Sequence, residues 1–165
     1  MKGEGINLQI RAATAADVPL LLKFIRAMAA FEKLQVPATE EDLRNSLFGE
    51  DPVAFPLLAF VDGKPAAYAV YFFTFSTMLA KRGLWLDDVF VDPAFRGNGV
   101  AKAIMAHLAN VALDKDCGRF EWFVLDWNTP AIALYQQLGA SIHQDWKLCR
   151  LEEQGIARVA QRSGV

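Results

Sequence analysis

The stretch DDVFVDPAFRGNGVAKAIM, residues 87–105, joins an apolar strand to a helix through a basic, glycine-rich turn. The strand is expected to end at Val91, because Pro93 lacks the N–H group that a strand interior needs. From residue 98 to residue 114 the apolar residues recur at helical spacing. Glycines and an arginine before a helix start are typical of an anion-binding turn, since the first N–H groups of a helix have no partner inside it.

The same turn has a simpler interpretation. Its glycines can serve only to give the chain positive φ angles between a strand and a helix, with water on the N–H groups. Two other phosphate-binding motifs do not fit: GxxxxGK[ST] is absent, and Lys102 occupies the third glycine position of GxGxxG. A dinucleotide site would also follow the first strand of a parallel βαβ unit, whereas this turn follows three consecutive strands.

The remaining periodicity places the turn in a mixed sheet. Strands are expected at 6–12, 57–62, 66–75, 84–91, 120–127 and roughly 141–151, with helices between them and a short helical tail. The order is β-α-α-β-β-β-α-β-α-β. The three consecutive strands predict antiparallel pairing, and the crossover 84–127 predicts one parallel pair. We therefore expect a single α+β domain over residues 1–165, with a mostly antiparallel mixed sheet flanked by helices.

Several helix ends and turns carry local signals. Asp17 is expected to cap the first helix, with Pro19 in its first turn, and Thr39 to begin the second, which should stop near Gly49. Asp62-Gly63 predicts a tight turn between two strands. Later in the chain, Asn128 or Thr129 is expected to cap a helix that ends at Gly139.

The composition limits the classes of function. The chain has 165 residues, 53% of them hydrophobic and 22% charged, with a formal net charge of −2, as in folded soluble domains. The absence of a basic, aromatic-interleaved stripe argues against nucleic acid as a partner, and no apolar run is long enough to cross a membrane. The two cysteines are too few for a disulfide framework, which indicates a reduced cytoplasmic setting. The two histidines do not form a metal-ligand cluster. The polar start of the sequence predicts no signal peptide.

Two blocks of the chain resemble the GNAT acetyltransferase superfamily. RGNGVA at 96–101 matches its Q/R-x-x-G-x-G/A signature, and WNTPAIALYQQLGA at 127–140 is similar to its late N-x-x-A-x-x-x-Y-x-x-x-G-A segment. From IRAATAAD at 10–17 to WKLCRL at 146–151, the chain resembles the spermidine/spermine and thialysine N-acetyltransferase branch. The resemblance implies the GNAT fold, acetyl-CoA as donor, no metal, and direct transfer to an amine in a ternary complex.

The resemblance also implies a donor site. The backbone of Val89, Phe90 and Val91 would pair with the pantetheine arm of acetyl-CoA like an added strand. Arg96 would add a cation with bidentate geometry, and the pyrophosphate would rest on Gly97, Asn98, Gly99, Val100, Ala101 and Lys102. Asn128 would bind the cofactor from the far side of a splayed sheet, and Tyr135 would lie near the thioester sulfur.

The chemistry requires two proton movements. An alkyl amine has a pKa of ~10.4 and must lose a proton before it attacks the thioester. Asp87 stands where this branch usually has Glu and is the expected base, directly or through water. Because adjacent strand residues face opposite sides, only one of Asp87 and Asp88 is expected to reach the amine. Tyr135 is the expected proton donor to the leaving thiolate, and a backbone N–H of 89–91 the expected oxyanion donor.

The acceptor pocket is less well specified. Phe31 and Glu32 align with an aromatic-acidic pair that contacts the amine in this branch, and Glu121, Trp122 and Phe123 align with a strand that contacts substrate. Structural readings remain for each group: capping or an ion pair with Arg82 for the aspartates, core packing for Tyr135 and the aromatics, and solvation for Glu32.

The departures from the branch pattern all fall on the acceptor side: Asp87 is one methylene shorter than Glu, Met78 replaces a tryptophan, and Phe31 lacks a tyrosine hydroxyl. The acceptor therefore stays open among polyamines, diamines, thialysine-like amino acids and other small primary amines. The alternatives are an acetyltransferase for protein N-termini or lysines, and a silent acyl-CoA-binding module. The resemblance also implies a homodimer.

Overall fold

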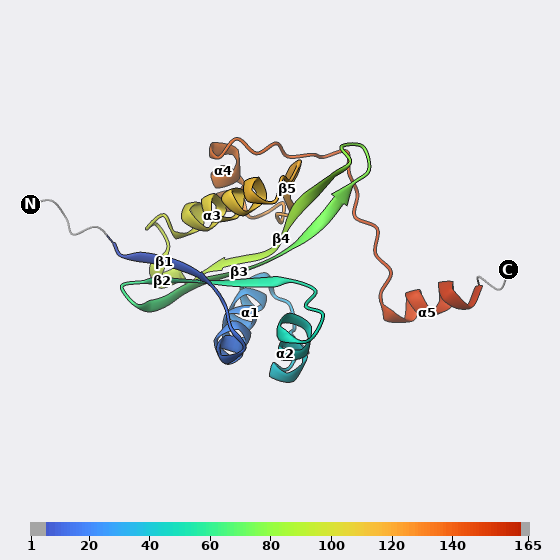
Figure 1. Cartoon of the computed structure of the whole chain (residues 1–165), viewed down its shortest axis with the longest axis horizontal. Helices are drawn as coiled ribbons and strands as arrows, with labels where there is room; N and C mark the ends of the chain where they lie inside the picture. Colours follow the sequence, from blue (N-terminus) through green and yellow to red (C-terminus); the bar gives the residue numbers. More distant parts are fainter. Residues whose placement is uncertain (1–5, 163–165) are drawn as a thin grey trace, which may run out of the picture. The chain divides into compact units, whose positions relative to one another are not determined.

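The computed structural model describes residues 6–162, which its internal contacts divide into two units on either side of the Val124–Leu125 bond (Figure 1). The first unit holds a five-stranded sheet with helices α1, α2 and α3, and the second holds α4 and α5. The single domain expected over residues 1–165 stays a prediction. None of the helices in the described part of the chain is both long and apolar enough to span a membrane.

The sheet follows the predicted topology. Its strands lie in the order β1-β2-β3-β4-β5. The first four pair antiparallel, whereas β4 and β5 pair parallel, which confirms the one parallel pair expected from the crossover. The strand bounds are β1 Leu8–Ala12, β2 Phe55–Val61, β3 Lys64–Ser76, β4 Lys81–Val91 and β5 Arg119–Trp122.

The hairpin turns differ in how well the sequence predicts them. Asp62 and Gly63 have φ angles of 50° and 75°, the left-handed conformation that a two-residue hairpin turn of type I′ requires. The next hairpin is longer than expected. Because β3 and β4 pair as far as Ser76 and Lys81, the loop predicted at 76–83 is reduced to residues 77–80.

The helix bounds agree with the local signals. A 3₁₀ turn, Ala15–Asp17, leads into α1, and a second one, Pro93–Phe95, follows β4. Asp17 is the N-cap of α1 and is fixed by Arg11, which donates to its two carboxylate oxygens at 2.7 and 2.9 Å. Thr39 caps α2, accepting from the Asp42 N–H at 3.2 Å, as its position predicts. The helices are α1 Val18–Glu32, α2 Glu40–Phe48, α3 Val100–Asp114, α4 Thr129–Gln137 and α5 Glu153–Arg162.

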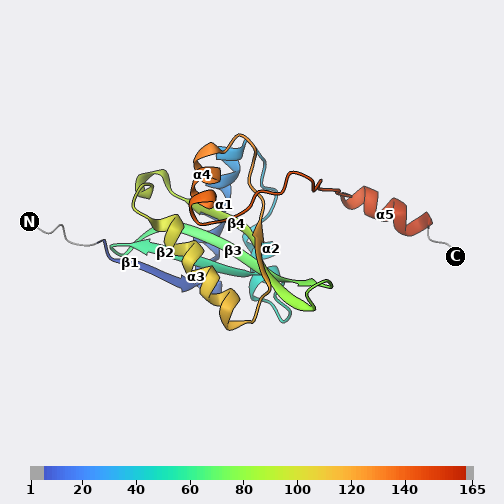
Figure 2. The ribbon, with the colours of Figure 1, turned by 90° about the horizontal axis from the view of Figure 1, so that it is seen from above.

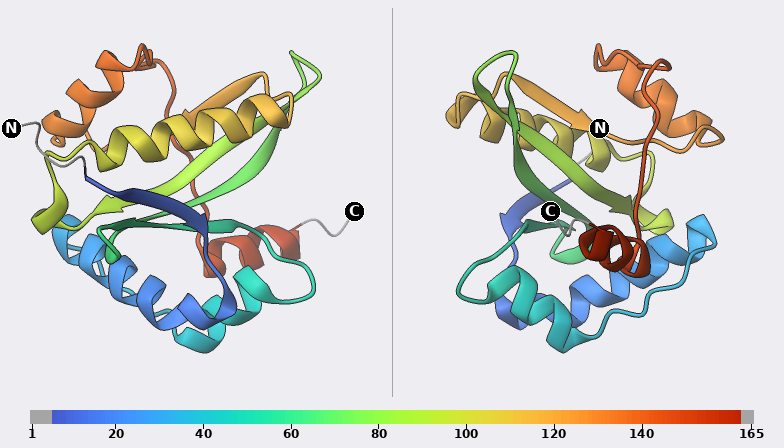
Figure 3. Two further views of the ribbon diagram at one scale, coloured as in Figure 1. Left: turned by 60° about the vertical axis from the view of Figure 1, so that its left-hand side comes forward. Right: turned by 90° about the vertical axis from the view of Figure 1, so that its right-hand side faces the viewer.

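Helices cover both faces of the sheet in the first unit. Figure 3 shows α1 and α2 beneath the strands and α3 above them, and Figure 2 shows α3 crossing the strands. On the α1 face, Phe24 stacks on Tyr68 with ring centroids 5.9 Å apart. The core on this face consists of Leu21, Phe24, Ala54, Leu58, Tyr68, Val70 and Phe90. On the other side, α3 buries Val100, Ile104 and Leu108.

The last expected strand does not form. Residues 123–162 contain helices and irregular chain but no strand, and β5 ends at Trp122, five residues earlier than predicted. Alternation alone suggested a strand at 141–151, but a strand is stable only when paired, and the described part of the second unit offers no partner strand. The side chains of this segment are consequently open to solvent, with Trp146 83% exposed.

Candidate active site

A β-bulge in β4 shapes the centre of the site. Val70 of β3 lies opposite Asp88, whereas the next residue, Tyr71, lies opposite Leu86, so Asp87 has no partner residue in β3. An extra residue in one strand shifts the alternation of side chains by one position. Trp85 before the bulge and Asp88 after it therefore face the same side of the sheet. That side is the α1 face, where Val70 belongs to the buried core.

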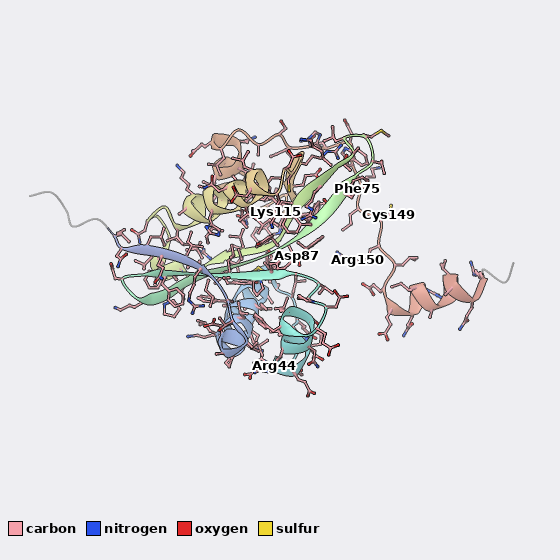
Figure 4. The ribbon with its side chains drawn as sticks, viewed as in Figure 1. Arg44, Phe75, Asp87, Lys115, Cys149 and Arg150 are labelled. Carbon is pink, nitrogen blue, oxygen red and sulfur yellow. The ribbon has the colours of Figure 1, made fainter. Side chains whose placement is uncertain are left out.

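The bulge lies at one of the two carboxylates. Simple alternation predicts that Asp87 and Asp88 face opposite sides, and the extra residue interrupts the alternation at Asp87, so that expectation stays a prediction. Burial, the charge of Asp87 and the charge of Glu32 raise the pKa of Asp88, which a hydrogen bond from Tyr68 partly lowers, to about 6. Burial raises the pKa of Asp87 as well, although the residue is exposed to solvent. Figure 4 labels Asp87 beside β4. The two carboxylates are therefore close enough for the charge of Asp87 to raise the pKa of Asp88.

The end of α1 adds two predicted acceptor residues to this face. The helix stops because Lys33 takes a left-handed conformation, with φ of 58°. Just before it, Glu32 is near enough for its charge to raise the pKa of both Asp88 and Tyr68. Phe31 is 42% exposed. Three of the seven predicted acceptor residues, Phe31, Glu32 and Asp88, thus come from α1 and β4 on one face of the sheet, and Asp87 is the neighbour of Asp88 in the bulge.

One edge of β4 is open next to the bulge. β5 pairs only with residues 83–86 of β4, so within the described chain residues 87–91 have β3 on one side and no strand on the other. The Asp92 N–H donates to the Ala66 carbonyl at 2.9 Å, which turns the backbone groups of Asp92 toward β3. Because antiparallel strands alternate, the N–H and C=O groups of Val91 and Val89 face the open edge, whereas those of Phe90 face β3.

The RGNGVA turn forms an open cradle at the start of α3. Gly97 and Gly99 have φ angles of 79° and 76°, and a Cβ added to either would meet no atom within 4 Å. The Ala103 N–H donates to the Gly99 carbonyl at 3.0 Å. The N–H groups of residues 100–102 precede that bond and lie in the first turn, where no intrahelical acceptor exists. Positive φ, open space and unpaired amides fit a phosphate group.

Arg96 connects this cradle to the rest of the site. Its Nε donates to the Val91 carbonyl at 3.0 Å, which is one of the groups on the open edge of β4. Its guanidinium carbon lies 5.2 Å from the centre of the Phe31 ring and 5.6 Å from that of Phe90. Asn98 stays within the turn, where its Nδ2 donates to the Phe95 carbonyl at 3.3 Å. Arg96 therefore reaches toward the end of α1 and not only toward the cradle.

The three predicted residues around β5 are less closely grouped with the carboxylates. Glu121 lies 3.8 Å from Arg119, and the Trp122 ring lies 4.9 Å from Phe120. Phe123 follows the last residue of β5 and is 66% exposed. Its ring meets Trp85 edge-on at 4.8 Å. Through Trp85, Phe123 contacts the side chains that face α1.

Two residues of this face were not predicted from the sequence. Tyr68 is fully buried, yet its hydroxyl donates to Asp88 at 3.2 Å. Trp85 links Phe123 to Phe72, whose ring lies 6.3 Å away. The available signal for Tyr68 was a single hydroxyl-bearing side chain within the apolar run AAYAV. Trp85 gave no comparable signal, because its face depends on the position of the bulge.

The second unit presents the remaining predicted residues on α4. Asn128 is the N-cap, with its Oδ1 accepting from the Ala131 N–H at 3.4 Å, which settles the choice between Asn128 and Thr129. Tyr135 is 7% exposed, and burial raises the pKa of its phenol. Seven residues apart, Asn128 and Tyr135 share a face of the helix. Their roles toward a donor stay predictions.

The backbone that carries Tyr135 is held by the end of α4. Gly139 has a φ angle of 87°. The Gly139 N–H donates to the Gln136 carbonyl, and the Ala140 N–H donates to the Tyr135 carbonyl, both at 3.0 Å. This pair of bonds is a Schellman motif, and it confirms the predicted role of Gly139 at the helix end.

Comparisons with known proteins agree with this geometry. The sequence model of the acetyltransferase (GNAT) family matches residues 23–140. A thialysine N-epsilon-acetyltransferase of Sus scrofa is 38% identical over 167 residues, covering 93% of this chain and 98% of that protein. The L-ornithine N5-acetyltransferase NATA1 of Arabidopsis thaliana is 28% identical over 196 residues, covering 90% of this chain and 86% of that protein.

A solved structure shares the architecture as well. The integron cassette protein VCH_CASS6 from V. cholerae superposes with a TM-score of 0.77 at 25% sequence identity, covering 96% of this chain and 99% of that protein. The family match spans β2 to α4, and with them the bulge, the cradle and Tyr135. The chain therefore belongs to the acetyltransferase (GNAT) family, and it is an N-acetyltransferase.

Proposed function

We propose that the protein transfers the acetyl group of acetyl-CoA to a primary amine of a small molecule that carries a second positive charge. One observation carries the proposal: the Asp88 carboxylate lies on the α1 face, where Tyr68 donates to it and the charges of Asp87 and Glu32 act on it, next to the point where β4 loses its second neighbour. An anionic acceptor site thus adjoins an open strand edge. Acetyl-CoA is the donor that the GNAT family uses, and the cradle at 96–102 has the chemistry to hold its pyrophosphate.

The donor would lie along β4 and over the start of α3. The N–H and C=O groups of Val89 and Val91 are oriented to pair with the amides of a pantetheine arm. The amides of residues 100–102 and the Arg96 guanidinium supply donors for phosphate oxygens. Asn128 and Tyr135 of α4 have their proposed roles toward the donor from family resemblance alone.

The charges of the site support a cationic acceptor. Asp87, Asp88 and Glu32 come from two elements and influence one another electrostatically. Such a group of negative charges favours a bound ammonium ion. The names of the two similar enzymes, which refer to thialysine and ornithine, both describe amino acids with an additional amine. Diamines and polyamines share this property and belong to the same proposed class.

The chemistry follows from the placement of the acids. Asp87 would accept a proton from the bound ammonium, directly or through water, because it combines partial burial with access to solvent. The neutral amine nitrogen then attacks the thioester carbonyl carbon, and the C–S bond breaks as the tetrahedral intermediate collapses. The backbone N–H of Val89 or Val91 is oriented to stabilise the oxyanion. Tyr135 would return a proton to the CoA thiolate.

The test is acetyl-CoA-dependent thiol release against a panel of amines: thialysine, ornithine, lysine, spermidine, putrescine and a peptide amine. We expect turnover with at least one small diammonium compound, a strong loss in Asp87→Asn and Tyr135→Phe, and little change in Asp116→Asn. Asp116 is the matched control, because its exposed carboxylate pairs at 2.8 Å with Lys81, the first residue of β4.

Other outcomes would contradict the proposal in distinct ways. Turnover of the peptide amine alone would indicate a protein acetyltransferase. Acetyl-CoA binding in calorimetry without turnover of any amine would indicate a silent acyl-CoA-binding module. A homodimer, implied by family resemblance, and a cytoplasmic location, expected from the two cysteines, are also part of the proposal. Sedimentation of the purified chain and fractionation of its source cells would test them.

A further inference from the structure

Tyr68 places a hydroxyl group inside the acceptor face. The residue lies in the middle of β3, opposite Phe90, and is fully buried. Its ring stacks on Phe24 with an angle of 12° between the planes. Its hydroxyl lies 3.2 Å from Oδ2 of Asp88 and 3.3 Å from the Met28 sulfur. A phenol has one proton to donate, and a carboxylate is a far better acceptor than a thioether, so the proton is directed at Asp88.

We propose that Tyr68 is a positioning residue of the acceptor site, which holds the Asp88 carboxylate on the α1 face and in its charged form. The inference rests on the proposed function only for its kinetic consequences. Nothing in the chemistry requires Tyr68 to touch the substrate, because its hydroxyl lies beneath Asp88 and is enclosed by α1 and β3.

The charges around Asp88 explain why such a residue is needed. Asp87 on the same strand and Glu32 from α1 both repel a second negative charge, and burial adds to the effect, so all three raise the pKa of Asp88. The hydrogen bond from Tyr68 acts in the opposite direction. On the same face, Arg96 directs its guanidinium toward Phe31 and Phe90. Tyr68 is therefore the contact that keeps Asp88 ionised near neutral pH.

The phenol is suited to this task because it keeps its own proton. Burial, the charge and hydrogen bond of Asp88, and the charges of Glu32 and Asp87 all raise the pKa of Tyr68 far above its ordinary value. It stays a donor across the working pH range. The two adjacent acids then have different roles. Asp88, which accepts the hydrogen bond from Tyr68, binds the ammonium ion, and the more accessible Asp87 takes its proton.

The experiment compares Tyr68→Phe with Tyr71→Phe. Phenylalanine retains the ring that packs on Phe24 and removes only the hydroxyl. Tyr71 is the matched control, because it lies on the same strand but opposite Leu86, on the other face, where its ring contacts Phe55 and Phe73. Carboxyl ¹³C NMR of the full chain, without ligand, gives the pKa of Asp88 in each variant, with Asp88→Asn used to assign its signal.

We expect Tyr68→Phe to raise the pKa of Asp88 by about one unit, since a hydrogen bond to a charged group is worth that much. The acidic limb of kcat/KM for the amine should move to higher pH by a similar amount, with the rise in KM larger than the fall in kcat. Tyr71→Phe should change neither quantity. In the unsubstituted protein, the Tyr68 phenol ¹³C signal should follow the titration of Asp88, which tests the contact even if Tyr68→Phe folds poorly.

An unchanged pKa of Asp88 in Tyr68→Phe, or an equal shift in Tyr71→Phe, would overturn the inference. A Tyr68 phenol signal that ignores the titration of Asp88 would do the same. The NMR measurement needs no substrate, so it separates the two claims. If no amine is acetylated but the pKa shift appears, the proposed function fails while the inference stands.

Discussion

The guanidinium of Arg96 lies over the ring of Phe31, 5.2 Å from its centre, while its Nε holds the Val91 carbonyl at 3.0 Å. One side chain thereby links the glycine turn before α3, the open edge of β4 and the last turn of α1. These are the proposed donor and acceptor regions. Arg96 is consequently expected to influence both substrates, although it belongs to the phosphate-binding turn.

Arg96→Ala should weaken acetyl-CoA binding about tenfold, through loss of a charged hydrogen-bond donor, and raise the KM for the amine a few-fold, through loss of the contact with Phe31. Calorimetry and steady-state kinetics measure the two effects. Arg82→Ala is the matched control, because it removes the same charge at another place. The guanidinium carbon of Arg82 lies 4.8 Å from the centre of the Phe73 ring. Equal effects of the two substitutions would show that net charge, and not the position of Arg96, controls binding.

Gly99→Ala should lower both stability and donor affinity. A left-handed conformation disfavours alanine by about 1 kcal/mol, and a Cβ at this position would point into the space where the phosphates are expected. Gly63→Ala provides the control, because Gly63 has nearly the same φ, 75° against 76°, and equally open surroundings, but lies in a hairpin turn. Thermal unfolding should show similar losses for both variants. Calorimetry should show weaker acetyl-CoA binding for Gly99→Ala only, and equal affinities would exclude the cradle.

Asp88→Asn should make the protein more stable while impairing catalysis. The pKa of Asp88 in the folded chain is about 6, above its ordinary value of 3.8, so ionisation is unfavourable in the folded state. Above pH 6 the charged Asp88 carboxylate lowers the free energy of unfolding. Below about pH 4 it has no effect, because the carboxyl group is protonated in both the folded and the unfolded chain. The substitution should therefore add roughly 1–3 kcal/mol at pH 7–8, and this gain should vanish toward pH 4.

Asp17→Asn gives the opposite sign and serves as the comparison. Hydrogen bonds from Arg11 lower the pKa of Asp17, so its contribution to stability is fully present above pH 4 and is lost as the pH falls further. Urea unfolding of both variants from pH 3 to pH 8 measures the two curves. A loss of stability in Asp88→Asn at pH 7 would show that the carboxylate is a structural partner and not a strained functional group.

Tyr135→Phe should lower kcat about 10- to 1,000-fold, as expected for removal of a general acid, and leave acetyl-CoA affinity nearly unchanged. Burial raises the pKa of Tyr135, so the phenol keeps its proton as the pH rises. Deprotonation of Tyr135 should therefore cause no loss of activity below pH 10. Steady-state kinetics across pH 6–10 tests both statements. An unaltered kcat would leave Tyr135 with only a packing role.

The sequence predicts those parts of the fold that depend on neighbouring residues. Thr39, Asp62-Gly63 and Gly139 each stand at a backbone position with a strong local preference, and each has the expected structure. The glycines of 96–101 belong to the same group. The family resemblance added what periodicity could not, namely the proposal that Asp87, Asp88, Phe31 and Glu32, far apart in sequence, belong to one acceptor site.

Features that depend on pairing between strands were beyond the sequence. Asp87 carries no mark of a bulge, because the extra residue is defined by the register with Val70 and Tyr71 on another strand. Tyr68 acquires its role from the same register. The prediction of a strand at 141–151 was wrong because the sequence does not show which strands lie within reach of this segment. Its alternation is adequate for a strand, but a strand requires a neighbouring strand with which to pair.

The bulge also bears on how this site could be transferred to another protein. A designer who copied Trp85 to Asp88 onto a regular strand would place Trp85 and Asp88 on opposite faces of the sheet. The smallest portable unit is therefore a segment of two strands, Leu86 to Phe90 with Tyr68 to Tyr71, in which one strand is a residue longer than its partner. The active site is encoded by a difference in length between two strands, as much as by the side chains they carry.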